Sequence, residues 1–279
     1  MKSKVWFVTG ASKGLGLSLV KKLLKEGYQV AATSRSKQEL EKAVGNSTTF
    51  LPLAVDLKNE SSVEKAISDT VARFGAVDVV VNNAGYGLTG SLEELSDAEV
   101  RQNFDINVFG VLNVIRKVLP YMRKQKSGHI FNIASIGGFT GLFPGFGSYT
   151  ATKFAMHGFS ESLSAEVKQF GINVTIVSPG YFRTQFLDAG SLGVPKNQIA
   201  DYQLVREIEQ VHQNNINGNQ AGDPDKASAV MIEVAEQKEP PLHLFLGKDA
   251  YQLADAKIKS VQQDMNAVKE LATSTDFVQ

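Results

Sequence analysis

The chain has 279 residues, with 29 Lys+Arg balancing 29 Asp+Glu, and it contains no Cys. Zero net charge gives no electrostatic support for binding nucleic acid, and the lack of Cys excludes a disulfide framework, a thiolate zinc site and a Cys nucleophile. The four His residues include no His-x-x-x-His pair, so we expect no metal site. Met1–Lys4 is too short for a signal peptide, and no apolar run approaches the ~20 residues of a membrane span. We therefore expect a cytoplasmic protein without a membrane span or a nucleic-acid partner.

Short apolar runs alternate with amphipathic stretches along the chain. The runs predicted to be strands are Lys4–Val8, Gln29–Thr33, Thr49–Val55, Val77–Val81, His129–Ala134, Asn173–Val177 and Leu242–Leu246. Most of them are continuously apolar and β-branched, as expected for a parallel sheet that is buried on both faces. The stretches predicted to be helices include Gly14–Glu26, Ser61–Phe74, Asp97–Lys124, Ser148–Phe170 and Pro224–Glu236. This alternation predicts one α/β domain over residues 1–279, a doubly wound, parallel, seven-stranded sheet of the Rossmann type.

A glycine-rich turn, Thr9–Gly16, directly follows the first predicted strand and opens the first helix. Gly10 permits a tight turn, Gly14 lets the backbone approach a pyrophosphate, and Gly16 allows close packing of helix on strand. The N-terminus of the helix adds free N–H groups and a partial positive charge. The turn therefore predicts a dinucleotide-binding loop, although a purely structural glycine turn is the alternative.

Two segments depart from the alternation. Residues 183–222 are long, irregular and polar toward their end, which is typical of a substrate lid. After the last strand, apolar residues recur at steps of three and four and predict an amphipathic helix over about 249–271. They are Tyr251, Ala254, Ile258, Val261, Met265 and Val268. We expect this helix to cover its own domain, with helix-to-helix contact in a dimer as the alternative.

The spacing Gly-x-x-x-Gly-x-Gly within Thr9–Gly16 resembles the short-chain dehydrogenase/reductase family. Further motifs of that family follow in its order: Asn82-Asn83-Ala84-Gly85, Asn107, Ser135, Tyr149-x-x-x-Lys153, Pro179-Gly180 and Thr184. The motifs span residues 5–184, and the strand pattern extends the resemblance to about residue 247. The stretch from Asn107 to Thr184 looks most like the 17β-hydroxysteroid dehydrogenase-like and retinol dehydrogenase-like branch.

The second strand ends in Ser34-Arg35, with no carboxylate to bind the ribose 2′-OH of NAD. An Arg at this place can hold a 2′-phosphate, and the resemblance places Lys13 near the same phosphate, so we expect NADP(H). The alternative is that Lys13 and Arg35 are solvated surface charges. The expected cofactor-binding residues are Gly10, Ser12, Lys13, Gly14, Leu15, Gly16, Ser34, Arg35, Asp56, Leu57, Asn83, Gly85, Tyr149, Lys153, Pro179, Gly180 and Thr184.

Tyr149 and Lys153 are four residues apart and so share one face of a predicted helix. Because a neighbouring ammonium favours the phenolate, we expect Lys153 to lower the pKa of Tyr149 and to make it a general acid and base. Ser135 follows the fifth strand and can polarise a substrate oxygen, whereas the alternative donor Ser148 stands at an expected helix N-cap. The resemblance implies that Lys153 also binds the nicotinamide ribose and that Asn107 completes a water-linked proton relay.

Aromatic residues gather in the segments that border the substrate pocket in the family. They are Phe139, Phe143, Phe146, Tyr181, Phe182 and Phe186, beside Tyr86–Leu88. They favour a bulky hydrophobic ketone or secondary alcohol as substrate, although they could also serve only to pack the loops. We expect an NADP-dependent carbonyl reductase or alcohol dehydrogenase. A sugar-nucleotide epimerase or dehydratase and a non-catalytic NADP-sensing regulator are the alternatives. Family habit implies a homodimer or homotetramer through the helices Asp97–Lys124 and Ser148–Phe170.

Overall fold

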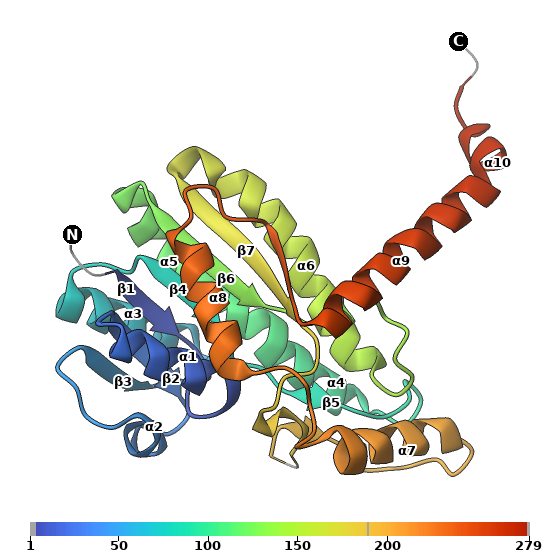
Figure 1. The fold of residues 1–279 in the computed structure, drawn as a ribbon, viewed down its shortest axis with the longest axis horizontal. Helices are drawn as coiled ribbons and strands as arrows, with labels where there is room; N and C mark the ends of the chain where they lie inside the picture. Colours follow the sequence, from blue (N-terminus) through green and yellow to red (C-terminus); the bar gives the residue numbers. More distant parts are fainter. Residues whose placement is uncertain (1–3, 189, 278–279) are drawn as a thin grey trace.

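A seven-stranded parallel sheet forms the centre of the computed structural model, which describes residues 4–188 and 190–277 (Figure 1). The ends of the predicted domain and residue 189 of the predicted lid lie outside the described residues. The strands are β1 (Val5–Val8), β2 (Gln29–Ser34), β3 (Phe50–Ala54), β4 (Val79–Asn82), β6 (Gly128–Ile133), β7 (Ile172–Pro179) and β9 (His243–Leu246). Their order, β3-β2-β1-β4-β6-β7-β9, reverses direction between β1 and β4, which is where doubly wound sheets bind ligands. All seven predicted strands and the fold class are confirmed.

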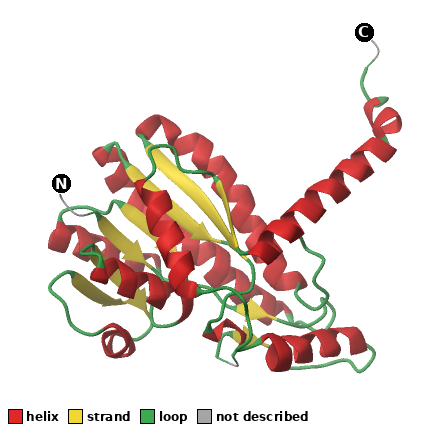
Figure 2. Ribbon diagram, viewed as in Figure 1, coloured by secondary structure: helices red, strands yellow, loops and turns green. Residues whose placement is uncertain are grey.

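Helices cover both faces of the sheet (Figure 2). On one face lie α1 (Gly14–Lys25), α2 (Lys37–Val44) and α8 (Pro224–Glu236). On the other lie α3 (Glu60–Phe74), α5 (Gly110–Gln125) and α6 (Gly147–Val167), which ends in a 3-10 turn, Lys168–Phe170. Side chains of one strand alternate between the layers, so Phe7 packs with the second group and Trp6 and Val8 with the first. Both faces are therefore buried, as the apolar strands predict.

The predicted helix Asp97–Lys124 is interrupted. It consists of α4 (Asp97–Phe104), a π-helical turn (Asp105–Phe109) and then α5. A π turn inserts one extra residue into a helix and usually needs tertiary contacts to hold it. Here the buried Asn107 lies inside the turn and hydrogen-bonds outside its own helix, which explains why the periodicity of the sequence did not show the interruption.

The segment 183–222 is more ordered than predicted. It contains a 3-10 turn (Gln185–Leu187), β8 (Leu192–Gly193) paired in parallel with β5 (Gly87–Leu88), α7 (Gln203–Gln210) and a π turn (Val211–Ile216). Arg206 of α7 holds the segment to the body, because it pairs with Glu94 at 2.8 Å. Within α7 it also pairs with Glu209 at 2.6 Å. Despite its burial, Glu94 has a lowered pKa, because backbone N–H groups of Ser91 and Ile199 and the Arg206 guanidinium stabilise its carboxylate. The expectation of an irregular segment is therefore wrong.

The C-terminal helices α9 (Lys248–Ala267) and α10 (Lys269–Thr273) project away from the body (Figure 1). Within α9 only Ala250 and Ala254, near its base, are buried among the described residues. The expectation that this helix covers its own domain is therefore wrong beyond the first two turns. Within residues 4–188 and 190–277, no helix has the length and apolar character needed to cross a membrane.

Candidate active site

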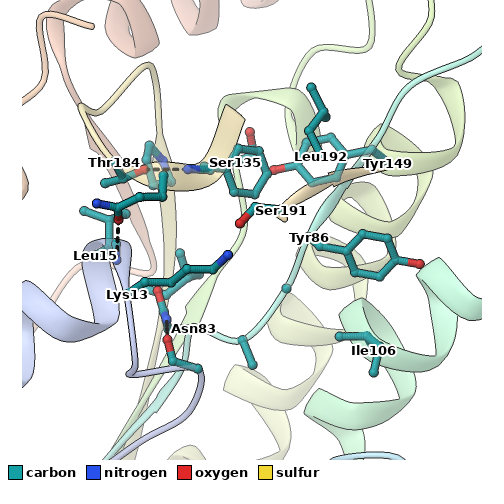
Figure 3. Close-up of a pocket in the computed structure, with 18 of the residues that line it drawn as sticks. Lys13, Leu15, Asn83, Tyr86, Ile106, Ser135, Tyr149, Thr184, Ser191 and Leu192 are labelled. Atoms are coloured by element: carbon teal, nitrogen blue, oxygen red, sulfur yellow. Dashed lines mark hydrogen bonds between the residues drawn. The ribbon is translucent and has the colours of Figure 1, made fainter. Parts of the chain in front are cut away.

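A cavity of about 930 Å³ opens at the carboxyl ends of the central strands and reaches under the segment 183–222. Ser135 and Tyr149 lie toward one end of it, and Lys13 and Asn83 lie toward the other (Figure 3). The predicted site residues that line it are Gly10, Ser12, Lys13, Gly14, Leu15, Ser34, Arg35, Asp56, Leu57, Asn83, Gly85, Ser135, Tyr149, Lys153, Pro179, Gly180 and Thr184. Gly16 and Asn107 lie behind this wall. The structure thus brings together motifs that are far apart in the sequence.

The glycine loop has the backbone that its sequence predicts. Gly10 and Gly14 have φ values of +64° and +60°, a region that disfavours residues with a side chain. A Cβ on Gly10 would also lie 2.6 Å from Cα of Ala84. Asn83 fixes the backbone of the loop, because its Nδ2 donates to the carbonyl oxygens of Thr9 at 3.0 Å and of Gly10 at 2.9 Å.

The N-terminus of α1 is open to an anion. No side chain of its own caps it, and its first turn holds no acidic residue. The Gly14 N–H donates instead to Oε1 of Gln185 at 3.2 Å, and Nζ of Lys13 donates to the Gly190 carbonyl at 3.3 Å. Both acceptors come from the segment 183–222 and are uncharged. A phosphate group, with its negative oxygens, therefore fits these donors.

Cationic residues line the same cavity near the end of β2. The exposed Arg35 guanidinium has no hydrogen-bond or ion-pair partner in the described part of the chain, whereas the Ser34 hydroxyl donates to the Ser36 carbonyl at 2.5 Å. Lys58, which the sequence did not single out, also lines this side. Its position after the third strand was the only available signal.

Three predicted catalytic residues share the other end of the cavity. The Ser135 hydroxyl accepts from the Gly137 N–H at 3.0 Å and so caps a 3-10 turn, Ile136–Gly138. On α6, Lys153 directs Nζ to the Ile133 carbonyl at 2.8 Å, and this nitrogen lies 5.8 Å from the centroid of the Tyr149 ring. The predicted common face of Tyr149 and Lys153 is thus present.

Burial dominates the protonation of this pair. It raises the pKa of Tyr149 to about 12, although a hydrogen bond with Ser135 opposes the increase, and it lowers the pKa of Lys153 to about 7. The expectation that Lys153 lowers the pKa of Tyr149 is wrong for this state, because both groups are desolvated and the Lys153 nitrogen is directed at a carbonyl. Tyr149 is therefore protonated at neutral pH and can donate a proton to a carbonyl oxygen.

Asn107 lies behind the cavity wall, and Ser148 lies differently from expectation. Asn107 is fully buried behind Tyr86, where its Oδ1 accepts from the Tyr86 N–H at 3.1 Å and its Nδ2 donates to the Tyr86 carbonyl at 3.0 Å. Nδ2 also donates to Oγ1 of Thr152 at 3.1 Å, which joins the π turn to α6. Ser148 lies inside the first turn of α6, which begins at Gly147, so the predicted N-cap at Ser148 is wrong.

The wall opposite the glycine loop is largely aromatic and apolar. Its lining residues include Tyr86, Ile106, Phe143, Phe146, Tyr181, Phe182, Phe186, Leu187 and Leu192. Gly87, Leu88 and Phe139 do not line the cavity, contrary to expectation. Phe139 turns to the far side of its 3-10 turn and packs edge-on against Phe245, with 5.1 Å between the ring centroids.

A hydrogen-bonded chain within this wall was not foreseen in the sequence. Nδ1 of His212 donates to the Ile208 carbonyl at 2.8 Å, so Nε2 of His212 accepts from the Tyr181 hydroxyl at 2.8 Å. The Tyr181 N–H donates to the Asp249 carboxylate at 2.7 Å, which connects this wall to the base of α9. The two contacts of Tyr181 join distant segments, and no local motif marks them.

Comparisons with known proteins agree with this geometry. A family model described as short chain dehydrogenase matches residues 4–191. Oxidoreductase BOA17 of Botryotinia fuckeliana is 35% identical over 276 residues, which cover 98% of this chain and 99% of that protein. A 3-ketodihydrosphingosine reductase of Bacteroides thetaiotaomicron is 37% identical over 262 residues, 93% of each chain. A solved short-chain dehydrogenase from Streptomyces avermitilis is 35% identical, with a TM-score of 0.90 over 99% of this chain and 100% of that one.

Solved structures of lower similarity share the fold and differ in their ligand. At 22% to 25% identity they are complexes with NAD, NADH or NADP+. The choice between the two cofactors therefore rests on the residues of this chain.

Proposed function

The chain belongs to the short-chain dehydrogenase family, whose members are NAD(P)-dependent oxidoreductases, and from that premise we propose that it transfers a hydride between NADP(H) and a hydrophobic ketone or secondary alcohol. One observation carries the proposal. Ser135, Tyr149 and Lys153 line the same cavity as the glycine loop, so proton donors and an anion-binding helix end face one space. A hydride carrier and a carbonyl compound need that juxtaposition.

The glycine loop and the N-terminus of α1 would hold the pyrophosphate, with Asp56 and Leu57 on the adenine side. Pro179, Gly180 and Thr184 would border the nicotinamide half. When bound, the cofactor supplies or accepts the hydride. The remaining chemistry belongs to the chain's own residues.

Proton transfer falls to Tyr149. Its hydroxyl is protonated at neutral pH and lies beside the Ser135 hydroxyl, so both can donate to one substrate oxygen. Nζ of Lys153 lies 5.8 Å from the centroid of the Tyr149 ring, where a protonated Lys153 would stabilise the phenolate left after donation. Asn107 acts as a positioning residue, because it fixes the backbone of Tyr86 next to Gly85.

Cofactor preference follows from Lys13 and Arg35. The Arg35 guanidinium has no partner among the described residues, and no carboxylate stands at the end of β2, so this position favours a 2′-phosphate over a 2′-hydroxyl. Arg35→Ala should lower kcat/KM for NADPH about 10- to 100-fold, since a charged hydrogen bond contributes about 1.5–3 kcal/mol, and should leave kcat/KM for NADH unchanged. Lys37→Ala, which removes a nearby exposed cation, is the control. A wild-type preference for NADH would overturn the assignment.

The aromatic wall supports a large, mostly apolar substrate. The resemblance to a 3-ketodihydrosphingosine reductase favours a long-chain ketone with a polar group near the carbonyl. NADPH consumption measured with short, alicyclic, aryl and long-chain ketones tests this, because a long-chain ketone should have the lowest KM. Activity confined to small polar ketones would contradict it. The same assay separates hydride transfer from the epimerase and sensor alternatives, neither of which consumes NADPH stoichiometrically.

The segment 183–222 would act as the lid of this cavity. The family-type assembly through α4, α5 and α6 also stays a proposal, supported by the exposed Phe109 of the π turn before α5 and the exposed Phe154 of α6. A monomer by light scattering would contradict that assembly. The cytoplasmic location and the branch within the family stay predictions from the sequence.

A further inference from the structure

Two histidines from distant parts of the chain meet between α6 and β9. The rings of His157 and His243 stack with 6.0 Å between their centroids. Glu161 follows His157 by one helical turn and so shares its face of α6, and Oε1 of Glu161 lies 3.8 Å from Nε2 of His243. One potential ligand atom of each side chain lies within 4.8 Å of the other two. We call these three residues the His–Glu–His cluster.

The His157 ring is held in place from its buried side. It is 5% exposed, and its Nε2 lies 3.1 Å from the Ser178 hydroxyl. The Phe139 ring lies next to it, with 6.1 Å between the centroids. A histidine that ligates a metal usually directs its other ring nitrogen to a polar partner, which orients the ring. Ser178 supplies that partner for Nε2, so Nδ1 is the nitrogen that His157 offers to an ion.

The other two side chains of the cluster are able to adjust. Glu161 and His243 have side chains that are 55% and 37% exposed, and neither side chain makes a hydrogen bond within the described part of the chain. The 3.8 Å between them is too long for a hydrogen bond. Ligands of a tetrahedral zinc ion lie about 3.4 Å apart, because the bonds are about 2.1 Å long. Rotation of the two exposed side chains covers the approach of roughly 1.4 Å or less that the present separations require.

We propose that the His–Glu–His cluster binds Zn²⁺, with water in the fourth position. Two imidazole nitrogens and one carboxylate oxygen are ligands that zinc takes, whereas Mg²⁺ and Ca²⁺ select oxygen ligands. A simple ion pair between His243 and Glu161 is the competing interpretation. Such an exposed pair contributes little to stability, and it gives no role to the buried His157 that stacks on His243.

A bound ion would cross-link the edge of the sheet to a covering helix. β9 is the last strand of the sheet and pairs with β7 alone, and the ion would join it to α6. The folded chain would gain stability, because the unfolded chain does not bring the three ligands together. None of the three residues lines the cofactor cavity, so the proposal does not depend on hydride transfer. The sequence indicated no metal site because its His residues form no pair within one helix, whereas this cluster forms across two elements.

Calorimetric titration of the metal-free full chain with Zn²⁺ tests the cluster. The wild type should bind one ion per chain, and its thermal midpoint should rise with the Zn²⁺ concentration. His243→Gln and Glu161→Gln change exposed side chains, so both variants should fold. Each should weaken Zn²⁺ binding at least about tenfold, since even the outer partners of a metal ligand contribute that much. Glu166→Gln, an exposed change on the same helix, is the matched control and should bind Zn²⁺ as the wild type does.

Two outcomes of this titration would overturn the proposal. One is a wild type whose titration heat and thermal midpoint do not respond to Zn²⁺. The other is full Zn²⁺ binding by the double variant Glu161→Gln/His243→Gln, which would assign the ion to adventitious surface sites.

Other metal ions test the ligand set. Co²⁺ should give the visible absorption of tetrahedral coordination in the wild type but not in the double variant, and Zn²⁺ should displace it. Mg²⁺ should neither displace Co²⁺ nor raise the thermal midpoint, because it does not take imidazole ligands. Binding of Mg²⁺ as tight as that of Zn²⁺ would exclude nitrogen ligation and overturn the site.

Discussion

Gln185 accepts a hydrogen bond from the backbone N–H of Gly14 at 3.2 Å. The acceptor belongs to the segment after β7, and the donor belongs to the loop that opens α1. The Gly14 N–H thus already donates to a neutral amide oxygen, whereas a bound phosphate would need this N–H as a donor. The segment 183–222 and the glycine loop are therefore coupled, because Gln185 must release Gly14 before an anion binds there.

Removal of this internal competitor should strengthen cofactor binding. A hydrogen bond of this kind contributes a net of about 0.5–1.5 kcal/mol, so Gln185→Ala should lower the Kd for NADPH about 2- to 12-fold. Quenching of protein fluorescence during titration measures it. Gln198→Ala, an exposed position of the same segment, should leave the Kd unchanged. Weaker binding by Gln185→Ala would mean that this side chain holds the cofactor.

Two glycines should respond in opposite directions to the same substitution. A Cβ on Gly16 would lie 2.7 Å from the Gly10 carbonyl oxygen and against the Asn83 amide, so Gly16→Ala should cost about 1–3 kcal/mol of stability and displace the loop. Gly158, exposed in α6, has nothing within 4 Å of such a Cβ, and Gly158→Ala should stabilise the protein by about 0.5–1 kcal/mol. Urea unfolding measures both free energies. Wild-type NADPH affinity in Gly16→Ala would contradict the packing described for the loop.

Acid should destabilise the fold through His129. The Thr175 hydroxyl donates to the Pro241 carbonyl at 2.7 Å, so its oxygen accepts from Nε2 of His129 at 2.9 Å, and a second proton would enter at Nδ1. Burial lowers the pKa of His129 to about 3. Since the unfolded chain titrates near ~6.5, it binds a proton between these values that the folded chain does not. The contribution to stability is complete above pH ~6.5 and is lost as the pH falls toward about 3.

His129→Gln keeps a donor for Thr175 but cannot be protonated. Its urea midpoint should therefore change less between pH 7 and pH 5 than that of the wild type, which loses up to about 2 kcal/mol from this residue. Identical pH profiles for His129→Gln and the wild type would show that His129 does not carry the effect.

Replacement of Tyr149 and of Tyr181 by Phe should have very different effects on kcat, although both side chains line the cavity. Tyr149→Phe removes the proposed proton donor and should lower kcat about 10²- to 10⁴-fold without weakening NADPH binding. Tyr181→Phe loses only the hydrogen bond to His212 and should stay within about tenfold of the wild-type kcat. Stopped-flow measurement of NADPH oxidation with the best ketone compares them. Near-complete activity in Tyr149→Phe would remove it from the mechanism.

The sequence predicted the strands, the edge of the sheet where the motifs meet and the glycine loop, because each depends on a local sequence pattern. The buried strands can be predicted because parallel strands covered on both faces must be largely apolar, as in Val79, Val80 and Val81 of β4. The motif residues converge because the carboxyl ends of parallel strands meet at one edge of the sheet. Gly10 and Gly14 have the positive φ values that their loop requires.

The remaining features depend on contacts between distant segments. The π turn at Asn107 exists together with its hydrogen bonds to Tyr86 and Thr152, which no periodicity reveals. The raised pKa of Tyr149 reflects how completely the surrounding chain covers it, and the Tyr-x-x-x-Lys spacing contains no information on that burial. The heptad steps of α9 predicted a helix but not its partner, since the same stripe could face its own domain or another chain.

Asp249 gives the projecting helix a mechanical consequence for the cavity. It is the second residue of α9, and its carboxylate accepts the Tyr181 N–H at 2.7 Å and leaves no room for a Cβ on Gly180. The 20 residues of α9 span about 30 Å. Because Tyr181 lines the cavity, a displacement of the base of α9 that moves Asp249 removes a hydrogen bond from the cavity wall.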